Sequence, residues 1–321
     1  MLKVKTIQST ALMLLFIIII SNALLAFFDF GLKHNFNLKS AFIVSHPPSA
    51  KILVLGPCEP LWMVDPAIIS KNTGKSCYNL SLSHSDFADN YLHLYLYLQK
   101  NPPPSQILLF VTPESFDLRY NNFHPYRFAP WREDTAVQKV IADCQGLSFS
   151  ISGVLAFSSY LPYTHQLLFS AIQGWKHFLS GKDAPYFPDG FEPPAKIIWD
   201  NHYSDLMHSY TKGYKFNWSP LRGHYLEEIL KLCGNLGIRV LCFESPIWKG
   251  IAGYQLNRDN INQRIDSIAG KWDTKIIRFD HLKWAADRKW FISPMVTNLA
   301  GSSLFSDTLG KYLQRELLTK Y

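Results

Sequence analysis

The sequence lacks the features that mark nucleic-acid-binding and metal-binding proteins. It has no dense run of Lys or Arg and no nucleic-acid motif, although its formal net charge is +7. We therefore expect no DNA or RNA partner, and a basic surface of this kind equally suits anionic lipid headgroups or an acidic glycan. No Cys or His cluster has the spacing of metal ligands, Asp200, His202 and His208 included, so we predict no metal and no cofactor.

Charged residues are also few, at 18% of the 321 residues, whereas hydrophobic residues make up 47%. This balance excludes a disordered chain and predicts a folded protein with a substantial core. The sequence has no internal repeat and no low-complexity tract. The length suits one large domain, or a domain that carries an insertion.

A long uncharged segment occurs near the N-terminus. The 18 residues 11–28 contain no charge, and Lys3 and Lys5 precede them. As a helix they would span roughly 27 Å, close to the thickness of a hydrocarbon core. The leading lysines predict that residues 1–10 lie in the cytoplasm and that the chain crosses the inner (cytoplasmic) membrane once. The globular part would then lie in the periplasm or at the cell exterior.

A cleaved signal peptide is the alternative interpretation of this segment. Ser21–Ala23 offers small residues at the spacing of a cleavage site. The apolar residues continue through Phe28, however, which a cleavage site seldom tolerates. The sequence favours an uncleaved anchor, followed by a linker over residues 29–50.

The five cysteines are an odd number, so at least one has no partner within an exported chain. A Cys58–Cys77 disulfide is not expected, because Cys58 follows one parallel strand and Cys77 precedes the next, at opposite edges of a sheet. Cys233 and Cys242 are expected to be small buried hydrophobic residues.

Alternating apolar runs and amphipathic stretches predict a parallel α/β domain over residues 51–321. Its sheet would lie between helices, in a three-layer α/β/α arrangement. The expected strands are 52–55, 78–82, 106–111, 238–243 and 275–279, and the main helices begin near 85, 220, 256 and 302. Residues 114–218, rich in aromatic residues and Pro, are predicted to be an insertion that forms a lid or a partner-facing wall.

The first predicted strand leads to a small nucleophilic side chain. Ile52 to Leu55 is followed by Gly56 and, two residues later, by Cys58. A parallel sheet binds its ligands at the carboxyl ends of its strands. Cys58 is therefore the candidate nucleophile, and Glu59 a candidate contact for a substrate.

Four short motifs carry a resemblance to a known family. They are the strand with Gly56 and Cys58, then Val64–Pro66, Tyr78–Ser83 and Ile107–Pro113. Together they resemble the SGNH (GDSL-like) hydrolase superfamily, over residues 52–113 and 238–318. The chain is most similar to membrane-anchored members that act with membrane-bound O-acyltransferases on alginate, cellulose and teichoic acid. The resemblance implies a flavodoxin-like SGNH-hydrolase-type fold.

The chain departs from the family pattern at its catalytic positions. Cys58 stands where the family has its serine nucleophile, and His84 stands where a Gly backbone N–H helps to bind an oxyanion. When the last family block is aligned on Gly301, its Asp falls on Ser293 and its His falls on Val296. Val296 cannot accept a proton from a nucleophile, so the base is missing.

Two histidines are candidate substitute bases, and four residues are candidate substrate contacts. His84 and His281 each follow a strand whose carboxyl end lies at the same edge as Cys58. The resemblance and the strand ends give Glu59, Asn79, Glu114 and Asn298 as substrate contacts, although Glu114 equally fits an ordinary carboxylate at a helix start. Trp175, Trp199 and Trp218 could stack on sugars, but packing inside the insertion is the simpler interpretation.

Two functions follow as hypotheses. In the first, the protein is a catalytically degenerate accessory or glycan-binding component in O-acylation of a cell-surface polysaccharide, and docks on a membrane-bound O-acyltransferase. In the second, it is an active esterase or acyltransferase that uses Cys58. An envelope structural protein is a third interpretation. The first depends on family likeness, so it is an analogy from fold to role.

Overall fold

The computed structural model describes residues 2–46, 48–119, 123–145, 164–181, 189–196, 208–209 and 211–318. The chain divides into two compact units, each with its own hydrophobic core. Unit 1 comprises residues 1–46 and 124–186, and unit 2 comprises residues 47–123 and 187–321. The predicted single domain over 51–321 is thus divided, because the middle of its expected insertion packs with the N-terminal residues.

Unit 2 is built around a five-stranded parallel sheet with the order β2-β1-β3-β4-β5. The mixed α/β class and the five parallel strands predicted from the sequence are confirmed. The strands are β1 (Ile52–Leu55), β2 (Cys77–Asn79), β3 (Gln106–Phe110), β4 (Arg239–Glu244) and β5 (Lys275–Arg278).

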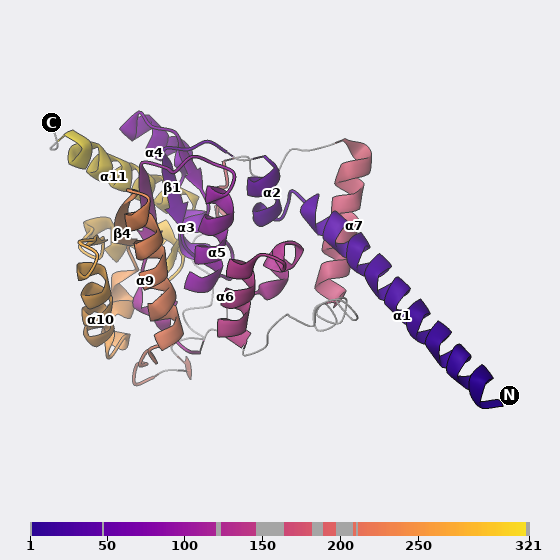
Figure 1. Cartoon of the computed structure of the whole chain (residues 1–321). Helices are drawn as coiled ribbons and strands as arrows, with labels where there is room; N and C mark the ends of the chain where they lie inside the picture. The colour runs from indigo at the N-terminus through magenta and orange to yellow at the C-terminus, as the bar shows by residue number, and fades with distance from the viewer. Residues whose placement is uncertain are drawn as a thin grey trace. The chain divides into compact units, whose positions relative to one another are not determined.

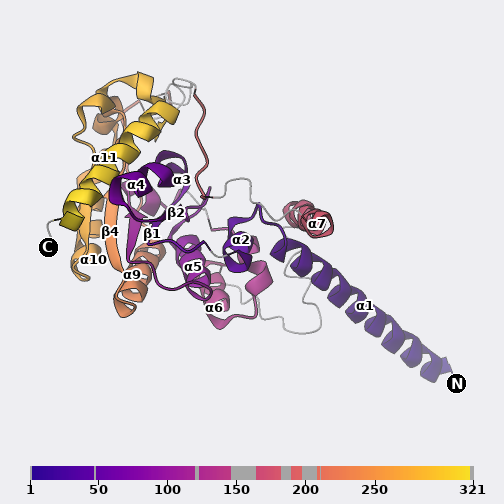
Figure 2. The same cartoon turned by 90° about the horizontal axis from the view of Figure 1, so that it is seen from above.

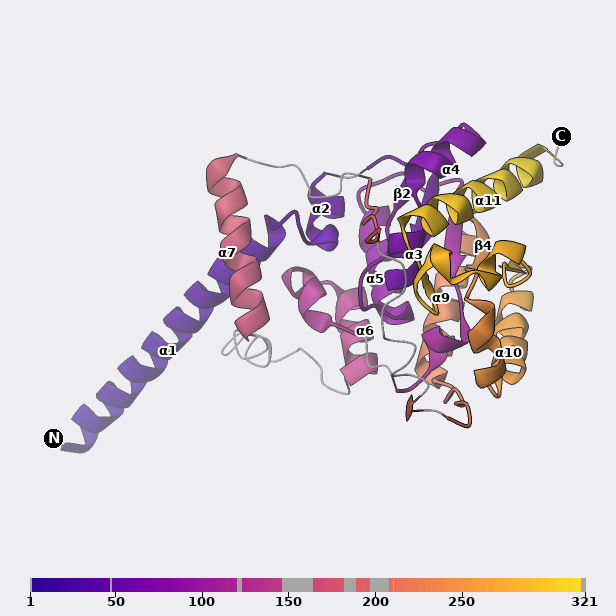
Figure 3. The same ribbon diagram turned by 180° about the vertical axis from the view of Figure 1, so that it is seen from behind.

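Helices cover both faces of this sheet, which gives the predicted three layers (Figures 1, 2 and 3). One face carries α3 (Cys58–Met63), α4 (Pro66–Thr73) and α11 (Leu299–Leu318). The other face carries α5 (Phe87–Leu98), α9 (Pro220–Asn235) and α10 (Arg258–Gly270). Because both faces are covered, the central strands are apolar along their length, as in other buried parallel sheets.

The core of unit 2 lies between the sheet and the α4–α11 layer. Val54 and Phe110 point to this side and pack with Phe305 and Leu309 of α11. Cys233 and Cys242 are buried, as predicted. None of the five cysteines, all within the described part of the chain, forms a disulfide.

Local capping explains where the helices of unit 2 begin. The Asp65 side chain accepts the N–H of Ala67 at the start of α4. Asp86 and Asp89 form a reciprocal capping box at the start of α5. Ser219 caps α9, whose first residue is a proline that needs no hydrogen-bond partner for its nitrogen.

Short elements at the carboxyl end of the sheet were not predicted. They are the hairpin of β6 (Phe291–Ser293) and β7 (Val296–Thr297), and the 3₁₀ helices η1 (Pro113–Phe116), η4 (Lys249–Tyr254), η5 (Lys283–Ala286) and η6 (Arg288–Trp290). Strands and helical turns of two to six residues are too short to show a hydrophobic period in the sequence.

The described residues of unit 1 form α1 (Leu2–Lys33), α2 (Lys39–Ser45), the 3₁₀ helix η2 (Pro125–Trp131), α6 (Thr135–Gln145) and α7 (Thr164–Ser180). Residues 8–33 of α1 are long and apolar enough to cross a membrane. Within the predicted linker over 29–50, α1 continues to Lys33 and α2 follows. Asp29 is held by an ion pair with Arg132 at 2.6 Å, while Phe28 and Leu32 are buried in the core of the unit.

Helices α1 and α7 meet through glycines. A Cβ at Gly174 would collide with the carbonyl oxygen of Gly31, and a Cβ at Gly31 would collide with Ala171. Small residues let the two backbones approach closely, as in membrane helix pairs. The Asn35 amide donates to the Ser170 carbonyl at 2.9 Å, and the Trp175 indole donates to the Phe27 carbonyl at 3.0 Å. Helix α7 therefore crosses α1 obliquely with little space between the backbones (Figures 1 and 3).

The tryptophans of the expected insertion are packed against other aromatic rings. The Trp175 ring lies 4.2 Å from that of Phe30 in unit 1, and the Trp218 ring stacks on Phe116 at 4.6 Å in unit 2. These contacts favour packing over stacking on sugars at both positions. Trp199, Asp200 and His202 lie outside the described residues.

The substitution Gly174→Val should separate α7 from α1, because its side chain has no space beside Gly31. Trypsin should then cleave after Lys176, in the middle of α7, faster than in the wild-type chain. Gly270→Val is the matched control, because a Cβ there meets nothing within 4 Å. Equal cleavage after Lys176 in wild type and Gly174→Val would contradict the close glycine contact.

Candidate functional site

The order of the strands creates a crevice at the carboxyl edge of the sheet. The chain passes from β1 outward to β2 and then returns to β3 on the other side of β1. Loops that leave β1 and β3 therefore diverge, and in open α/β sheets this switch point is where ligands bind. Cys58 and Glu59 follow β1, whereas Glu114 and Ser115 follow β3.

A pocket of about 180 Å³ occupies this switch point. The two loops, the segment after β2, the first turn of α9 and the β6–β7 turn all contribute to its wall. The lining residues are Pro57, Cys58, Glu59, His84, Ser85, Asp86, Glu114, Ser115, Arg222 and Met295. The structure thus brings together Cys58, Glu59, His84 and Glu114 from the predicted site.

The backbone beyond β2 brings Ser83 and His84 to Cys58. This segment still follows β1, because the N–H groups of Leu80 and Leu82 donate to the carbonyls of Val54 and Gly56. The His84 N–H then donates to Cys58 Sγ at 3.0 Å, and Ser83 Oγ lies 3.4 Å from the same sulfur. The Cys58 sulfur is therefore held in a polar environment.

His84 has an unusual backbone conformation. Its φ is +47°, in the left-handed region that favours glycine. This twist aims the His84 N–H at Cys58 Sγ, while the residue itself is exposed. The backbone N–H of His84 thus contacts the candidate nucleophile directly.

Glu59 and Glu114 form a pair of carboxyl groups in the pocket. Burial raises the pKa of Glu59 from 4.5 to about 7. A backbone hydrogen bond partly opposes this rise, and the charge of Glu114 adds to it. Burial also raises the pKa of Glu114, although the Arg258 guanidinium opposes it. Glu59 is therefore present as both acid and carboxylate near neutral pH, which is the condition for general acid–base chemistry.

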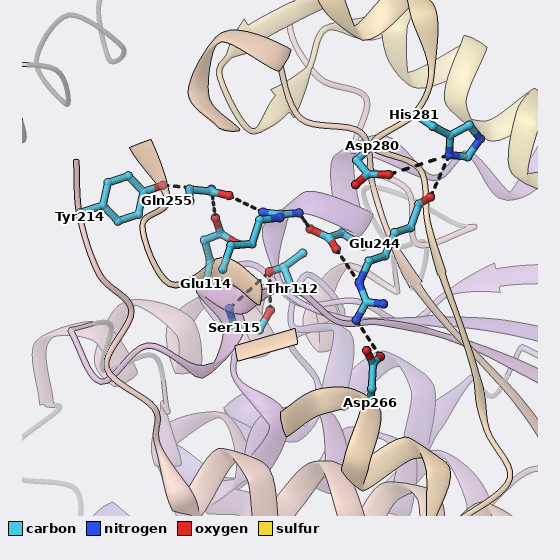
Figure 4. Close-up of polar contacts among 11 residues, drawn as sticks. Thr112, Glu114, Ser115, Tyr214, Glu244, Gln255, Asp266, Asp280 and His281 are labelled. Atoms are coloured by element: carbon cyan, nitrogen blue, oxygen red, sulfur yellow. Dashed lines mark hydrogen bonds and ion pairs between the residues drawn. The ribbon is translucent and has the colours of Figure 1, made fainter. Parts of the chain in front are cut away.

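A polar network holds Glu114 in place (Figure 4). The Gln255 amide donates to Glu114 and, at 3.1 Å, to the Tyr214 hydroxyl. Arg258 donates to both Gln255 and the buried Glu244 at the end of β4. The network orients Glu114 from the side opposite the Cys58 loop and links it to the neighbouring strand.

The network continues to a second, larger cavity of about 590 Å³ beyond β4 and β5. Arg278 lies 3.5 Å from Glu244 and 2.8 Å from Asp266, and both Arg278 and Asp266 line this cavity. Its other charged residues are Lys249, Arg258, Asp259 and Asp280. Cations and anions are balanced there, so the cavity does not select a ligand by charge.

Arg222 is a pocket residue that the sequence analysis missed. Its side chain is buried, its Nε lies 3.7 Å from Asp86, and its guanidinium donates to the Asp117 carbonyl. It lies in the first turn of α9. The sequence places this arginine on an otherwise apolar helix face. Because arginine is seldom buried unless it is paired, that position could have marked Arg222 as a candidate.

Two predicted substrate contacts have structural roles. The buried Asn79 amide donates to the carbonyls of Pro60 and Val64, and its oxygen accepts the Ser81 N–H. Asn298 is buried before the first turn of α11, where its oxygen accepts the Gly301 N–H and its amide donates to the Lys289 carbonyl. Neither residue lines the pocket.

The segment aligned with the last family motif reaches the pocket through Met295, and not through Ser293 or Val296. Ser293 and Val296 face each other in the β6–β7 hairpin, and β7 lies against α3. Val296 packs against the hydrophobic core, whereas Met295, in the turn, lines the pocket.

His281, the second candidate base, is exposed, and its Nδ1 contacts the Arg278 carbonyl at 3.1 Å (Figure 4). It is not among the residues that line the Cys58 pocket. Within the described ranges, no group of three or more His, Cys, Asp or Glu side chains is arranged to hold a metal ion. No family model matches the chain, and no curated protein matches it.

The pKa of Glu59 predicts a dependence of stability on pH. Because the folded value of about 7 exceeds 4.5, the folded state retains a proton that the unfolded state loses. The free energy of unfolding should therefore fall as pH rises from 4.5 to 7. Glu59→Gln removes the carboxyl group that causes this fall in the free energy of unfolding. It should raise the free energy of unfolding at pH 8 by about 1–3 kcal/mol relative to wild type. At pH 4 the removal of the carboxyl ionisation should give no gain.

Thermal unfolding of the detergent-solubilised full chain at both pH values measures this difference. Glu133→Gln is the control, at a carboxylate that is 92% exposed. A gain from Glu59→Gln that is equal at pH 4 and pH 8 would contradict the raised pKa.

Proposed function

We propose that the protein is a membrane-anchored, SGNH-like extracytoplasmic protein that binds a glycan or an acyl-bearing ligand at the β1–β3 switch point. In this role it is an accessory component in O-acylation of a cell-surface polysaccharide and docks on a membrane-bound O-acyltransferase. The polysaccharide and the acyltransferase come from the family resemblance alone.

The strand order and the backbone at the pocket support the SGNH-like assignment. The order 2-1-3-4-5 is that of flavodoxin-like sheets. Cys58 follows β1 at the family's nucleophile position, and His84 has a backbone conformation that favours the glycine of the family pattern. The β6–β7 turn reaches the same pocket, as the family's last block would.

The position of Val296 is the observation that best supports the accessory role. A half-buried valine that packs against the core stands where the family pattern has a histidine base, and Met295 is the neighbour that reaches the pocket. Neither side chain can take a proton from a nucleophile. The pocket keeps polar groups for holding a ligand without the base that an SGNH hydrolase uses.

Membrane anchoring is supported by α1, the one described helix that is long and apolar enough to span a bilayer. Lys3 and Lys5 favour a cytoplasmic N-terminus, with unit 2 on the other side of the inner membrane.

An active enzyme is the second candidate, and one observation favours it. Glu59, beside Cys58, has a pKa of about 7 and is therefore suited to act as a general base. In such an enzyme the Cys58 thiol would give its proton to Glu59, the thiolate would attack the ester carbonyl, and the alcohol would leave with the proton that Glu59 returns. Water would then hydrolyse the thioester, which releases the carboxylic acid and regenerates the thiol.

Hydrolysis of p-nitrophenyl acetate by the full-length chain in detergent separates the two candidates. For the accessory protein we expect wild type and Cys58→Ala to hydrolyse it at the same low rate, since losing a base costs about 10²- to 10⁴-fold. A wild-type rate that rises with pH through 7 and disappears in both Cys58→Ala and Glu59→Gln would establish the enzyme instead.

Alkylation of Cys58 by iodoacetamide tests ligand binding at the same pocket. Acetylated or unacetylated oligosaccharides of alginate, cellulose or teichoic acid that bind there should slow modification of Cys58, read by mass spectrometry of its peptide. The modification of Cys144, outside the pocket and in unit 1, is the internal control. Unchanged alkylation of Cys58 at saturating concentrations of every glycan would contradict glycan binding.

A further inference from the structure

Helix α7 presents three different faces. Leu167, Ala171 and Gly174 are buried against α1. A second face is exposed and mainly apolar. It carries His165 and Lys176 and four apolar side chains, those of Leu168, Phe169, Ile172 and Leu179. At 3.6 residues per turn these four side chains fall within an arc of about 100°. We call this set the apolar stripe.

The third face of α7 is polar. Ser170, Gln173, His177 and Ser180 lie on the side of the helix away from the apolar stripe. The apolar stripe is strongly exposed, with Phe169 at 67% and Leu179 at 78%. The helix thus has one face against α1, one polar and partly exposed face, and one exposed face that is mainly apolar.

The place where α7 crosses α1 indicates what covers the apolar stripe. Its contacts on α1 lie between Phe27 and Asn35. This is the C-terminal end of the apolar span, residues 8–33. From Ala11, where the uncharged run begins, to Gly31 is about 30 Å of helix, the thickness of a hydrocarbon core. If α1 spans the bilayer, α7 therefore lies at the outer boundary of the lipid.

We propose that α7 is an interfacial helix whose apolar stripe inserts between lipids at the outer surface of the membrane. The inference depends on the proposed anchoring by α1. Helix α1 likewise carries exposed hydrophobic side chains, between Leu12 and Phe27. An amphipathic helix in the plane of a bilayer buries such a stripe and keeps its polar face in water.

The charged groups near α7 fit this position. Lys176 lies within the arc of the apolar stripe and is exposed, and a lysine there can extend its ammonium to the headgroups. Asp29, the acidic residue within the apolar span, is paired with Arg132. The ion pair keeps an isolated carboxylate away from lipid at the same depth as α7.

Lipid photolabelling of the full-length wild-type chain tests the proposal. The protein is reconstituted in phosphatidylcholine–phosphatidylglycerol vesicles that contain a phosphatidylcholine with a diazirine on its acyl chain. After irradiation, mass spectrometry locates the adducts. We expect adducts on α1 and on residues 168–179, about tenfold or more above those on Leu236 and Leu256, which are exposed leucines of unit 2 at 44% and 54%.

A pair of variants gives a matched comparison. Phe169→Glu combined with Ile172→Glu should reduce labelling of α7 strongly, whereas Gln173→Glu, on the polar face, should leave it unchanged. Labelling of α1 reports separately on the anchor in every sample.

Three results would overturn the proposal. Adducts on α1 but not on α7 would refute the interfacial helix and leave the anchor intact. Adducts on neither helix would refute the anchor itself. A cross-link between two copies through α7, with no lipid adduct there, would show that a second chain covers the apolar stripe instead.

Discussion

The parallel pairing of β1 with both β2 and β3 is the constraint on which the candidate site depends. With β1 between its neighbours, the loops after β1 and β3 must diverge at the same edge, and a crevice opens between them. Cys58, Glu59 and Glu114 meet there only because of this pairing. If β2 lay between β1 and β3, the carboxyl groups of Glu59 and Glu114 would be separated by one more strand. Neither group would then lie close to the charge of the other.

Much of the fold could be predicted because its signals are local. The apolar runs from Ile52 and Gln106 fix buried strands, and the cap residues before α5 and α9 fix helix starts. The division into two units could not be predicted in this way. It depends on Gly31 meeting Gly174 and on Asp29 meeting Arg132, pairs that are more than 100 residues apart and carry no periodic signal of their own.

The residues of the candidate site likewise differ in whether a local sequence signal could reveal them. Cys58 was found because it follows a strand directly, and Glu59 and Glu114 were found for the same reason. Arg222 was missed, since its place in the pocket depends on how α9 packs against α5. Asn79 and Asn298 were assigned to substrate from motif position, but an asparagine amide also satisfies backbone groups where strands and helices end, and that is where both are found.

The charge state of the pocket bears on what it would hold. Arg222 is matched by Asp86 and by a backbone carbonyl, so it adds little uncompensated positive charge. Glu59 carries a proton part of the time near pH 7, mainly because burial raises its pKa, and the charge of Glu114 adds to the rise. A pocket with no uncompensated positive charge but many donors and acceptors is better matched to hydroxyl groups than to a phosphate or a sulfate. A strongly anionic ligand would add charge beside Glu114, whereas a sugar can donate to Glu114 and accept from protonated Glu59 at once.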